Sequence, residues 1–189
     1  DGMKIRKKSC HSRLYWPYSL PNLKNRQRTG KNTMTPLDKT DLKILEALQN
    51  DAKINAKTLA ADLHLSKTPI YERIKRLEEE GVIKQYVALV DPEKIGLPLV
   101  VFCNVTLSTH DNEHIRQFHE AIADIDEIME CYSIGGIHDF FLKVVVKDLK
   151  AYDRFVFEKL TKIKGISKMQ SSFVLSEMKH TTAFKPALG

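Results

Sequence analysis

A short stretch from Ser66 to Leu77 combines positive charge with the residue spacing of a single helix. It contains two lysines and two arginines against one glutamate, a local charge of +3. At about 100° per residue, Ile70, Ile74 and Leu77 fall on one side and leave the polar residues on the other. A helix face of this kind can place donors against base edges and phosphates in the major groove of DNA.

The expected DNA contacts divide by chemistry. Side chains suited to base edges are Thr68, Tyr71, Glu72 and Lys75, and those placed for phosphates are Ser66, Lys67 and Arg76. Arg73 lies nearer the apolar side, where we expect a structural role. The alternative is an ordinary solvent-exposed face, because any amphipathic surface helix carries charges there.

A second candidate site is the sequence GGIHDF at residues 135–140. Its two glycines allow a backbone to approach a ligand closely, and Asp139 offers a carboxylate to an α-ammonium group. The same residues also suit a plain hairpin connection, with glycine at the turn and the aspartate bonded to local backbone. The residues alone leave both interpretations open.

Other groups that could do chemistry are sparse. His110, His114 and His119 come nearest to a metal-binding set, but no cysteine or HExxH pattern accompanies them, and we interpret them as surface residues. GxSxG and dinucleotide motifs are absent, so we expect no enzyme, catalytic residue, metal or cofactor. The three cysteines form no CxxC pair, which favours a reducing cytoplasm over disulfides or zinc.

Three short helices are expected to position the cationic stretch. Asp38 can cap the first with Asp41 at its N3 position, and Asn55 can cap the second. The third is expected to begin after Ser66 and to end before Gly81, which suits a left-handed C′ position. The tight turn before Ser66 is typical of a helix-turn-helix, in which the later helix enters the major groove.

The pattern changes after this helical part. A strand is expected at 82–91, which closes a DNA-binding domain at 34–91, and a linker at 92–98 leads to a second domain at 99–189. Strands are expected there at 99–107, 128–134, 140–146 and 166–175. Apolar spacing predicts two helices, marked by Ile115, Phe118, Ile122 and Ile125 and by Leu149, Tyr152, Val156 and Leu160. This β-α-β-β-α-β order is ferredoxin-like and leaves one sheet face free for a second subunit.

The charge of the chain is unevenly distributed. Residues 1–33 hold nine of the 30 Lys and Arg residues and one of the 24 Asp and Glu residues, so they carry +8 and the remainder carries −2. We expect this segment to be a disordered extension before a native start at Met34; the alternative is a basic arm that follows DNA phosphates. No stretch approaches the roughly 18 to 20 apolar residues of a membrane span, so a soluble intracellular protein without a membrane partner is expected.

Three motifs in order resemble one known family. They are the LDxxDxxIL opening from Leu37, the LSxxxxxxRIxRLEExGVI stretch from Leu65 to Ile83, and the segment leading to DPEKIG. Together with a GxxD loop at residues 136–139, they resemble the leucine-responsive and asparagine-responsive (Lrp/AsnC) regulators from residue 36 to about residue 184.

The resemblance implies an α+β protein with a winged helix-turn-helix domain and a ferredoxin-like (ACT-like) sensing and oligomerisation domain. It implies a bacterial transcription regulator that dimerises through its sheets, commonly as four dimers in an octameric ring. An amino-acid effector would lie between dimers, near Gly135, Gly136, Ile137, His138, Asp139, Ser171 and Ser172. The family usually carries an acidic or polar residue and an aromatic where this chain has Ile137 and His138, so the sequence does not identify the amino acid.

Three functions are compatible with this sequence. The first is a transcription regulator that binds specific sequences of double-stranded DNA and whose activity responds to an amino acid. The second is an effector-independent, nucleoid-type architectural protein that packs DNA with little sequence choice. The third is a metabolite-binding module or enzyme in which the helical half serves assembly.

Overall fold

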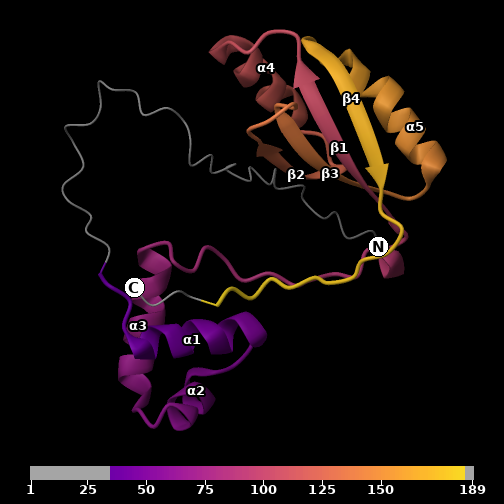
Figure 1. Cartoon of the computed structure of the whole chain (residues 1–189). Helices are drawn as coiled ribbons and strands as arrows, with labels where there is room; N and C mark the ends of the chain where they lie inside the picture. Colours follow the sequence, from indigo (N-terminus) through magenta and orange to yellow (C-terminus); the bar gives the residue numbers. More distant parts are fainter. Residues whose placement is uncertain (1–34, 186–189) are drawn as a thin grey trace, which may run out of the picture.

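Two separate hydrophobic cores organise residues 35–185, the part of the chain that the computed structural model describes (Figure 1). The predicted extension at 1–33 and the expected start at Met34 lie outside these residues. The first core belongs to three helices, and the second belongs to a four-stranded sheet with two helices. Among the described residues, no helix is long and apolar enough to cross a membrane.

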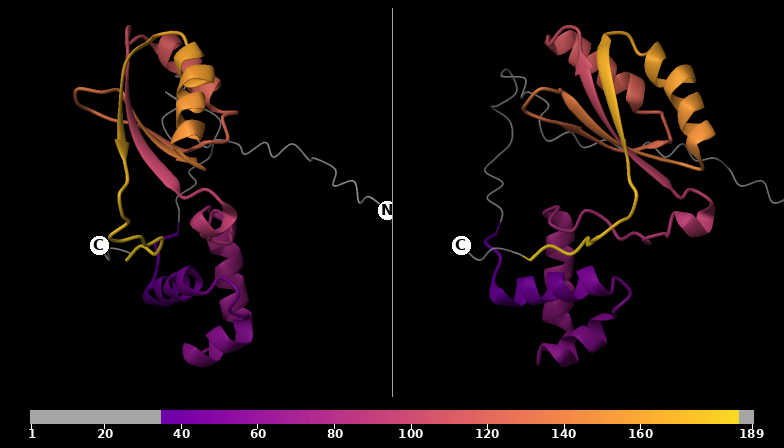
Figure 2. Two further views of the ribbon diagram at one scale, coloured as in Figure 1. Left: turned by 90° about the vertical axis from the view of Figure 1, so that its right-hand side faces the viewer. Right: turned by 45° about the vertical axis from the view of Figure 1, so that its right-hand side comes forward.

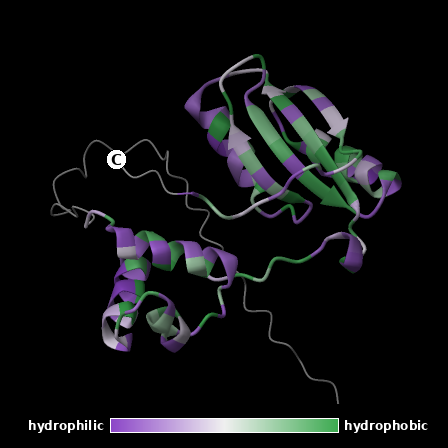
Figure 3. Ribbon diagram, turned by 60° about the horizontal axis from the view of Figure 1, so that its bottom comes forward, coloured by the Kyte–Doolittle hydropathy of each residue, from purple (hydrophilic) through white to green (hydrophobic). Residues whose placement is uncertain are grey.

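The helical unit contains α1 (Lys39–Asn50), α2 (Ala56–Asp62) and α3 (Lys67–Glu79). Each helix contributes to one core in which Ile44, Leu59, Ile70 and Leu77 are almost fully buried. Figure 3 shows green apolar and purple polar residues on the same helices, the amphipathic pattern that a small helical core requires.

The predicted helix starts are confirmed, but one cap works differently. Asp38 forms a full capping box with Asp41, and the Asn55 side chain accepts a hydrogen bond from the Thr58 N–H. Ser66 is the N-cap residue of α3, yet its hydroxyl makes no capping hydrogen bond. Gly81 follows α3 with φ of 72°, a left-handed conformation that glycine adopts without a steric penalty.

The strand expected at 82–91 is wrong. Residues 84–91 are extended but belong to no strand of the described sheet, and Tyr86, Val87, Leu89 and Val90 are exposed. The apolar residues that produced a strand-like pattern therefore have no sheet neighbour here. A short 3-10 helix, η1 (Glu93–Ile95), follows within the predicted linker.

The second unit has the predicted β-α-β-β-α-β order. Its elements are β1 (Leu99–Leu107), α4 (Asn112–Ile122), β2 (Ile128–Ser133), β3 (Phe140–Val146), α5 (Leu149–Glu158), η2 (Leu160–Lys162) and β4 (Ile166–Phe173). The strands pair antiparallel in the order β2-β3-β1-β4. Figure 2 shows α4 and α5 on one face of this sheet, so the opposite face is uncovered.

Side chains along the central strands point alternately to the covered and the uncovered face of the sheet. Odd-numbered residues of β1 from Val101 to Leu107 are buried beneath the helices, and the residues between them are only half-buried. The covering helices match their predicted faces closely. One difference is that Leu149 is exposed while Phe155, which the predicted spacing omits, is buried.

The chain returns to the helical unit after β4. Val174 still donates a backbone hydrogen bond to β1 (3.0 Å), and the chain then runs extended to residue 185. At its end, the Gln49 side chain of α1 accepts from the Phe184 N–H (2.7 Å) and donates to the Phe184 carbonyl (3.1 Å). The two units are thus linked both by residues 82–98 and by this C-terminal segment, as Figure 1 shows.

Candidate functional sites

The outer face of α3 is the candidate nucleic-acid interface. Six of the seven predicted DNA-contact residues are exposed, namely Ser66, Lys67, Thr68, Tyr71, Glu72 and Lys75. The buried Ile70 and Leu77 occupy the opposite side, so helix packing fixes which face points outward. Tyr71 is 65% exposed although it is a large aromatic, which suits a partner more than a core position.

Arg76, the seventh predicted residue, is held by a buried acid. Its Nη2 lies 2.6 Å from Oδ2 of Asp41, whose side chain is only 1% exposed. The neighbouring Arg73 Nη1 lies 2.7 Å from Asp41 Oδ1 and 2.7 Å from Asp38 Oδ2. The predicted structural role of Arg73 agrees with this contact, and a phosphate contact by Arg76 stays a prediction that competes with its ion pair.

This cluster joins α1 to α3 electrostatically. Burial raises the pKa of Asp41, but the hydrogen bond from the Asp38 N–H and the two neighbouring guanidinium groups outweigh it and hold the pKa below its ordinary value of 3.8. Asp41 is therefore a buried carboxylate with charged partners. It fixes the rotation of α3 about its own axis, and with it the direction in which Thr68, Tyr71 and Lys75 point.

The loop at residues 135–139 connects β2 to β3 at the end of β1. Gly135 and Gly136 are exposed, and Gly136 has φ of 150°, which side chains rarely adopt. Asp139 is fixed at the base of the loop: its N–H donates to the Val105 carbonyl and its carbonyl accepts from the Ile134 N–H, both at 2.9 Å. The predicted hairpin role and a binding role are therefore compatible in this loop.

Side chains of this loop point in different directions. Ile137 is 88% exposed, whereas His138 is 8% exposed and its Nδ1 lies 3.0 Å from Oγ1 of Thr106. Lys168, on β4, is the ladder partner of Thr106. Lys168 thus brings a cation to the same end of the sheet, a residue that sequence reasoning missed because the pairing of β1 with β4 joins positions far apart in the chain.

The two predicted serines do not lie beside the loop within one chain. Ser171 and Ser172 pair with Cys103 and Phe102, which lie three and four positions along β1 from Thr106, the residue that contacts His138 of the loop. At about 3.3 Å per residue this separates them from Thr106 by about 10 and 13 Å along the strand. They also face opposite ways, since Ser171 contacts the Tyr152 hydroxyl beneath the helices while Ser172 lies on the uncovered face.

Two of the three histidines near α4 contact carboxylates close by. His114 Nδ1 lies 2.7 Å from Asp111, the N-cap of α4, and His110 Nε2 lies 2.9 Å from Asp139. Within residues 35–185, no three His, Cys, Asp or Glu residues are grouped in a way that could hold a metal ion. Cys103 and Cys131 are not bonded to each other and lie in or against the core.

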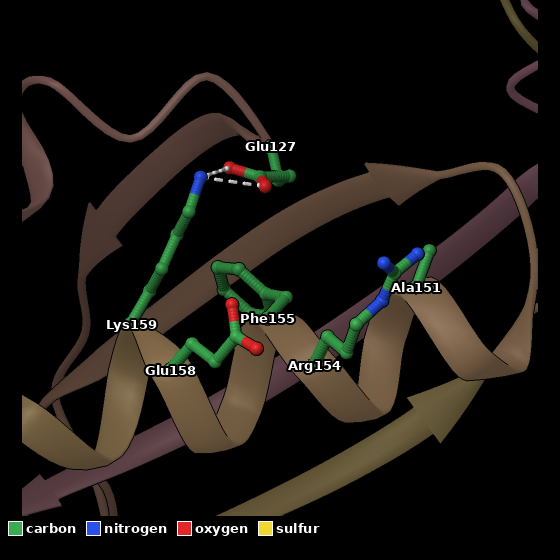
Figure 4. Close-up of a pocket in the computed structure, with 6 residues that line it drawn as sticks. All are labelled: Glu127, Ala151, Arg154, Phe155, Glu158 and Lys159. Carbon is green, nitrogen blue, oxygen red and sulfur yellow. Dashed lines mark hydrogen bonds and ion pairs between the residues drawn. The ribbon is translucent and has the colours of Figure 1, made fainter.

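A shallow hollow lies along α5 (Figure 4). It has a volume of about 210 Å³ and is lined by Glu127, Ala151, Arg154, Phe155, Glu158 and Lys159. Lys159 Nζ bridges both carboxylate oxygens of Glu127 at 2.7 Å, so two of its charges already neutralise each other. Its volume is below the roughly 300 Å³ at which ligand pockets begin, and we assign it no ligand.

Both units match known protein families. Residues 37–84 match the winged helix-turn-helix DNA-binding family, and residues 100–184 match the Lrp/AsnC ligand binding domain. The Bkd operon transcriptional regulator of Pseudomonas aeruginosa is 39% identical over 77% of this chain and 95% of its own length. The leucine-responsive regulatory protein of Escherichia coli K12 is 34% identical over 83% of this chain and 93% of its own length.

Solved structures show the same likeness. A transcriptional regulator from Neisseria meningitidis in complex with L-Met is 35% identical and superimposes with a TM-score of 0.75 over 79% of this chain and 96% of that one. An AsnC family regulator from Agrobacterium tumefaciens is 37% identical, with a TM-score of 0.75 over 78% of this chain and 96% of that one.

Proposed function

Because the chain belongs to the Lrp/AsnC family of transcription regulators, we propose that it reads specific DNA sites with α3 and responds to an amino acid held at the 135–139 loop. The observation that carries the DNA half is the exposed polar face of α3, which includes Thr68, Tyr71 and Lys75. These side chains extend from a helix whose other side is locked in a core, as base readout in the major groove requires.

The amino-acid half of the proposal rests on the end of the sheet. Asp139 offers a carboxylate to an ammonium group, and Lys168 offers a cation to a carboxylate, so both charges of an amino acid find a partner of opposite sign. Lys168 pairs with Thr106, and Asp139 lies beside Leu107, the next residue of β1. The Neisseria relative binds L-Met, which makes L-methionine the first amino acid to test on this chain.

We further propose that two chains associate through the uncovered sheet face. Phe102 and Phe141 stack on it with ring centroids 5.1 Å apart, and Lys143 lies 3.0 Å from Glu130 beside them. A half-buried aromatic pair with a neutralised charge pair suits an interface between like subunits. Light scattering should give a dimer or a multiple of dimers, up to the octamer that the family resemblance implies, and Phe102→Asp should lower the molar mass.

The DNA proposal is tested by binding of the full chain to DNA from upstream of its own gene and to unrelated DNA. Thr68→Ala with Lys75→Ala should remove the preference for the upstream DNA and leave the oligomer unchanged. Lys147→Ala, which removes an exposed lysine from the sheet unit, serves as the control and should bind like the wild type.

The same experiment separates the alternative functions. Wild-type binding to both DNAs with equal affinity would indicate an architectural protein, and the absence of salt-sensitive binding would indicate that the helical unit serves assembly alone. A preserved preference in the Thr68 and Lys75 double variant would overturn the assignment of α3 as the reading helix.

Because the proposed partner is bacterial DNA, the proposed regulator is a cytoplasmic protein.

A further inference from the structure

Both carboxylate oxygens of Asp139 already have partners inside the chain. Oδ2 accepts a hydrogen bond from the Leu107 N–H at 2.7 Å, and Oδ1 lies 2.9 Å from Nε2 of His110. An amino acid that brings its ammonium group to Asp139 therefore meets a side chain that already contacts one of the two carboxylate oxygens.

The two partners of Asp139 are not equally easy to displace. Leu107 belongs to β1, so its N–H is fixed by the sheet. His110 lies in the connection between β1 and α4, and its side chain is 66% exposed, whereas that of Asp139 is 22% exposed. Displacement of His110 disturbs no core packing, while the backbone bonds to Val105 and Ile134 keep Asp139 in position.

We propose that His110 occupies the place of the effector's ammonium group on Asp139 and leaves it when an amino acid binds. His110 is then an internal competitor that lowers the affinity for the effector. This inference rests on the proposed function, since it requires Asp139 to bind the ammonium group. The opposite role, in which His110 orients Asp139 and thereby assists binding, predicts the opposite effect of its removal.

The expected change in effector affinity follows from the solvent exposure of the contact between His110 and Asp139. Exposed ion pairs and hydrogen bonds contribute little, so loss of the competitor should lower the Kd for the effector by about two- to fivefold. His114 supplies a matched control. It lies four residues along the chain, its Nδ1 is 2.7 Å from Asp111, and its side chain is 37% exposed.

The experiment compares the full-length wild type, His110→Ala, His114→Ala and Asp139→Asn. Each of the twenty standard amino acids is first added singly in a thermal-shift assay, and those that shift the unfolding temperature of any variant are titrated by calorimetry. We expect His110→Ala to bind about two- to fivefold more tightly than the wild type and His114→Ala to match the wild type. Asp139→Asn should bind about tenfold or more weakly, because it loses a charged partner.

The outcomes distinguish failure of the inference from failure of the proposed function. If the wild type binds an amino acid and His110→Ala binds it equally or more weakly, His110 is no competitor and the effector site stands. If Asp139→Asn binds like the wild type, or if no amino acid binds the wild type or His110→Ala, the proposed site itself is refuted together with the role of His110.

Discussion

Asp41 is a residue whose environment decides how the helical unit holds together. Its carboxylate is almost fully buried, yet it accepts contacts from two guanidinium groups of α3 and from the N–H of Asp38. Loss of its charge would leave two arginines without their buried partner. The geometry of the DNA-reading helix therefore depends on an acid that cannot itself touch DNA.

We expect Asp41→Asn to lower the free energy of unfolding by about 2–3 kcal/mol. This is less than a fully buried pair would lose, because the arginine side chains are about 30% exposed and water screens them partly. Urea denaturation measures the change. Glu46→Gln, at an exposed position of the same helix, is the control and should shift the midpoint little.

The same acid predicts how stability depends on pH. The pKa of Asp41 is held below 3.8 in the folded chain, so its contribution to stability is present above about pH 4 and is lost as the pH falls through the lower folded value. Denaturation between pH 7 and pH 3 should show this loss in the wild type. An equally steep loss in Asp41→Asn would contradict the assignment.

Residue-scale sequence reasoning found Asp41 only in part. The sequence predicted Asp38 as the cap and Asp41 at the N3 position, which the structure confirms, because capping depends on residues three apart in the chain; the structure adds the reciprocal bond of a capping box. The contacts to Arg73 and Arg76 join positions more than 30 residues apart, and no local spacing encodes them. The contact of His110 with Asp139 was missed for the same reason.

At the scale of elements, the helix caps give a direct comparison. Asn55→Ala should cost about 1 kcal/mol of stability, because its side chain accepts the Thr58 N–H at 2.9 Å. Ser66→Ala should cost less than about 0.5 kcal/mol, since its hydroxyl makes no capping bond and the site is exposed. Thermal unfolding of the two variants measures both, and a larger loss for Ser66→Ala would contradict the observed caps.

Elements that pack against a partner were the most predictable. The strands of the sheet unit were predicted within two residues, because buried runs and alternation follow from a sheet with one covered face. The segment at 82–91 has the same apolar composition but no strand to pair with in the described chain, and composition alone cannot supply a neighbour. The strand prediction failed at 82–91 because this segment has no neighbouring strand, although its residues favour a strand.

At the scale of the whole molecule, the C-terminal segment gives the DNA-reading unit a second connection to the sheet. Gln49→Ala removes both hydrogen bonds to the Phe184 peptide and should speed hydrogen exchange of the Phe184 amide about fivefold, the effect of losing about 1 kcal/mol of protection. Gln117→Ala, an exposed glutamine of α4, is the control. Unchanged exchange in Gln49→Ala would show that this connection does not form in solution.

The candidate effector site also depends on how whole chains are arranged. The sequence placed the loop and the strand serines in one site, but in a single chain about 10 to 13 Å of β1 lies between them. Residues of the loop and Ser172 can act together only if different copies supply them. We therefore expect effector binding to depend on protein concentration in the range where the oligomer forms.

The contact between Gln49 and Phe184 determines which substitutions position 184 can accept during evolution. The two hydrogen bonds of Gln49 to residue 184 join its peptide N–H and carbonyl, and the Phe184 side chain is exposed, with 81% for the residue. Nearly any side chain at position 184 can therefore replace phenylalanine over generations without altering the contact. Proline is the exception, because it has no N–H to donate, so the position tolerates variety in its side chain and selects on its backbone alone.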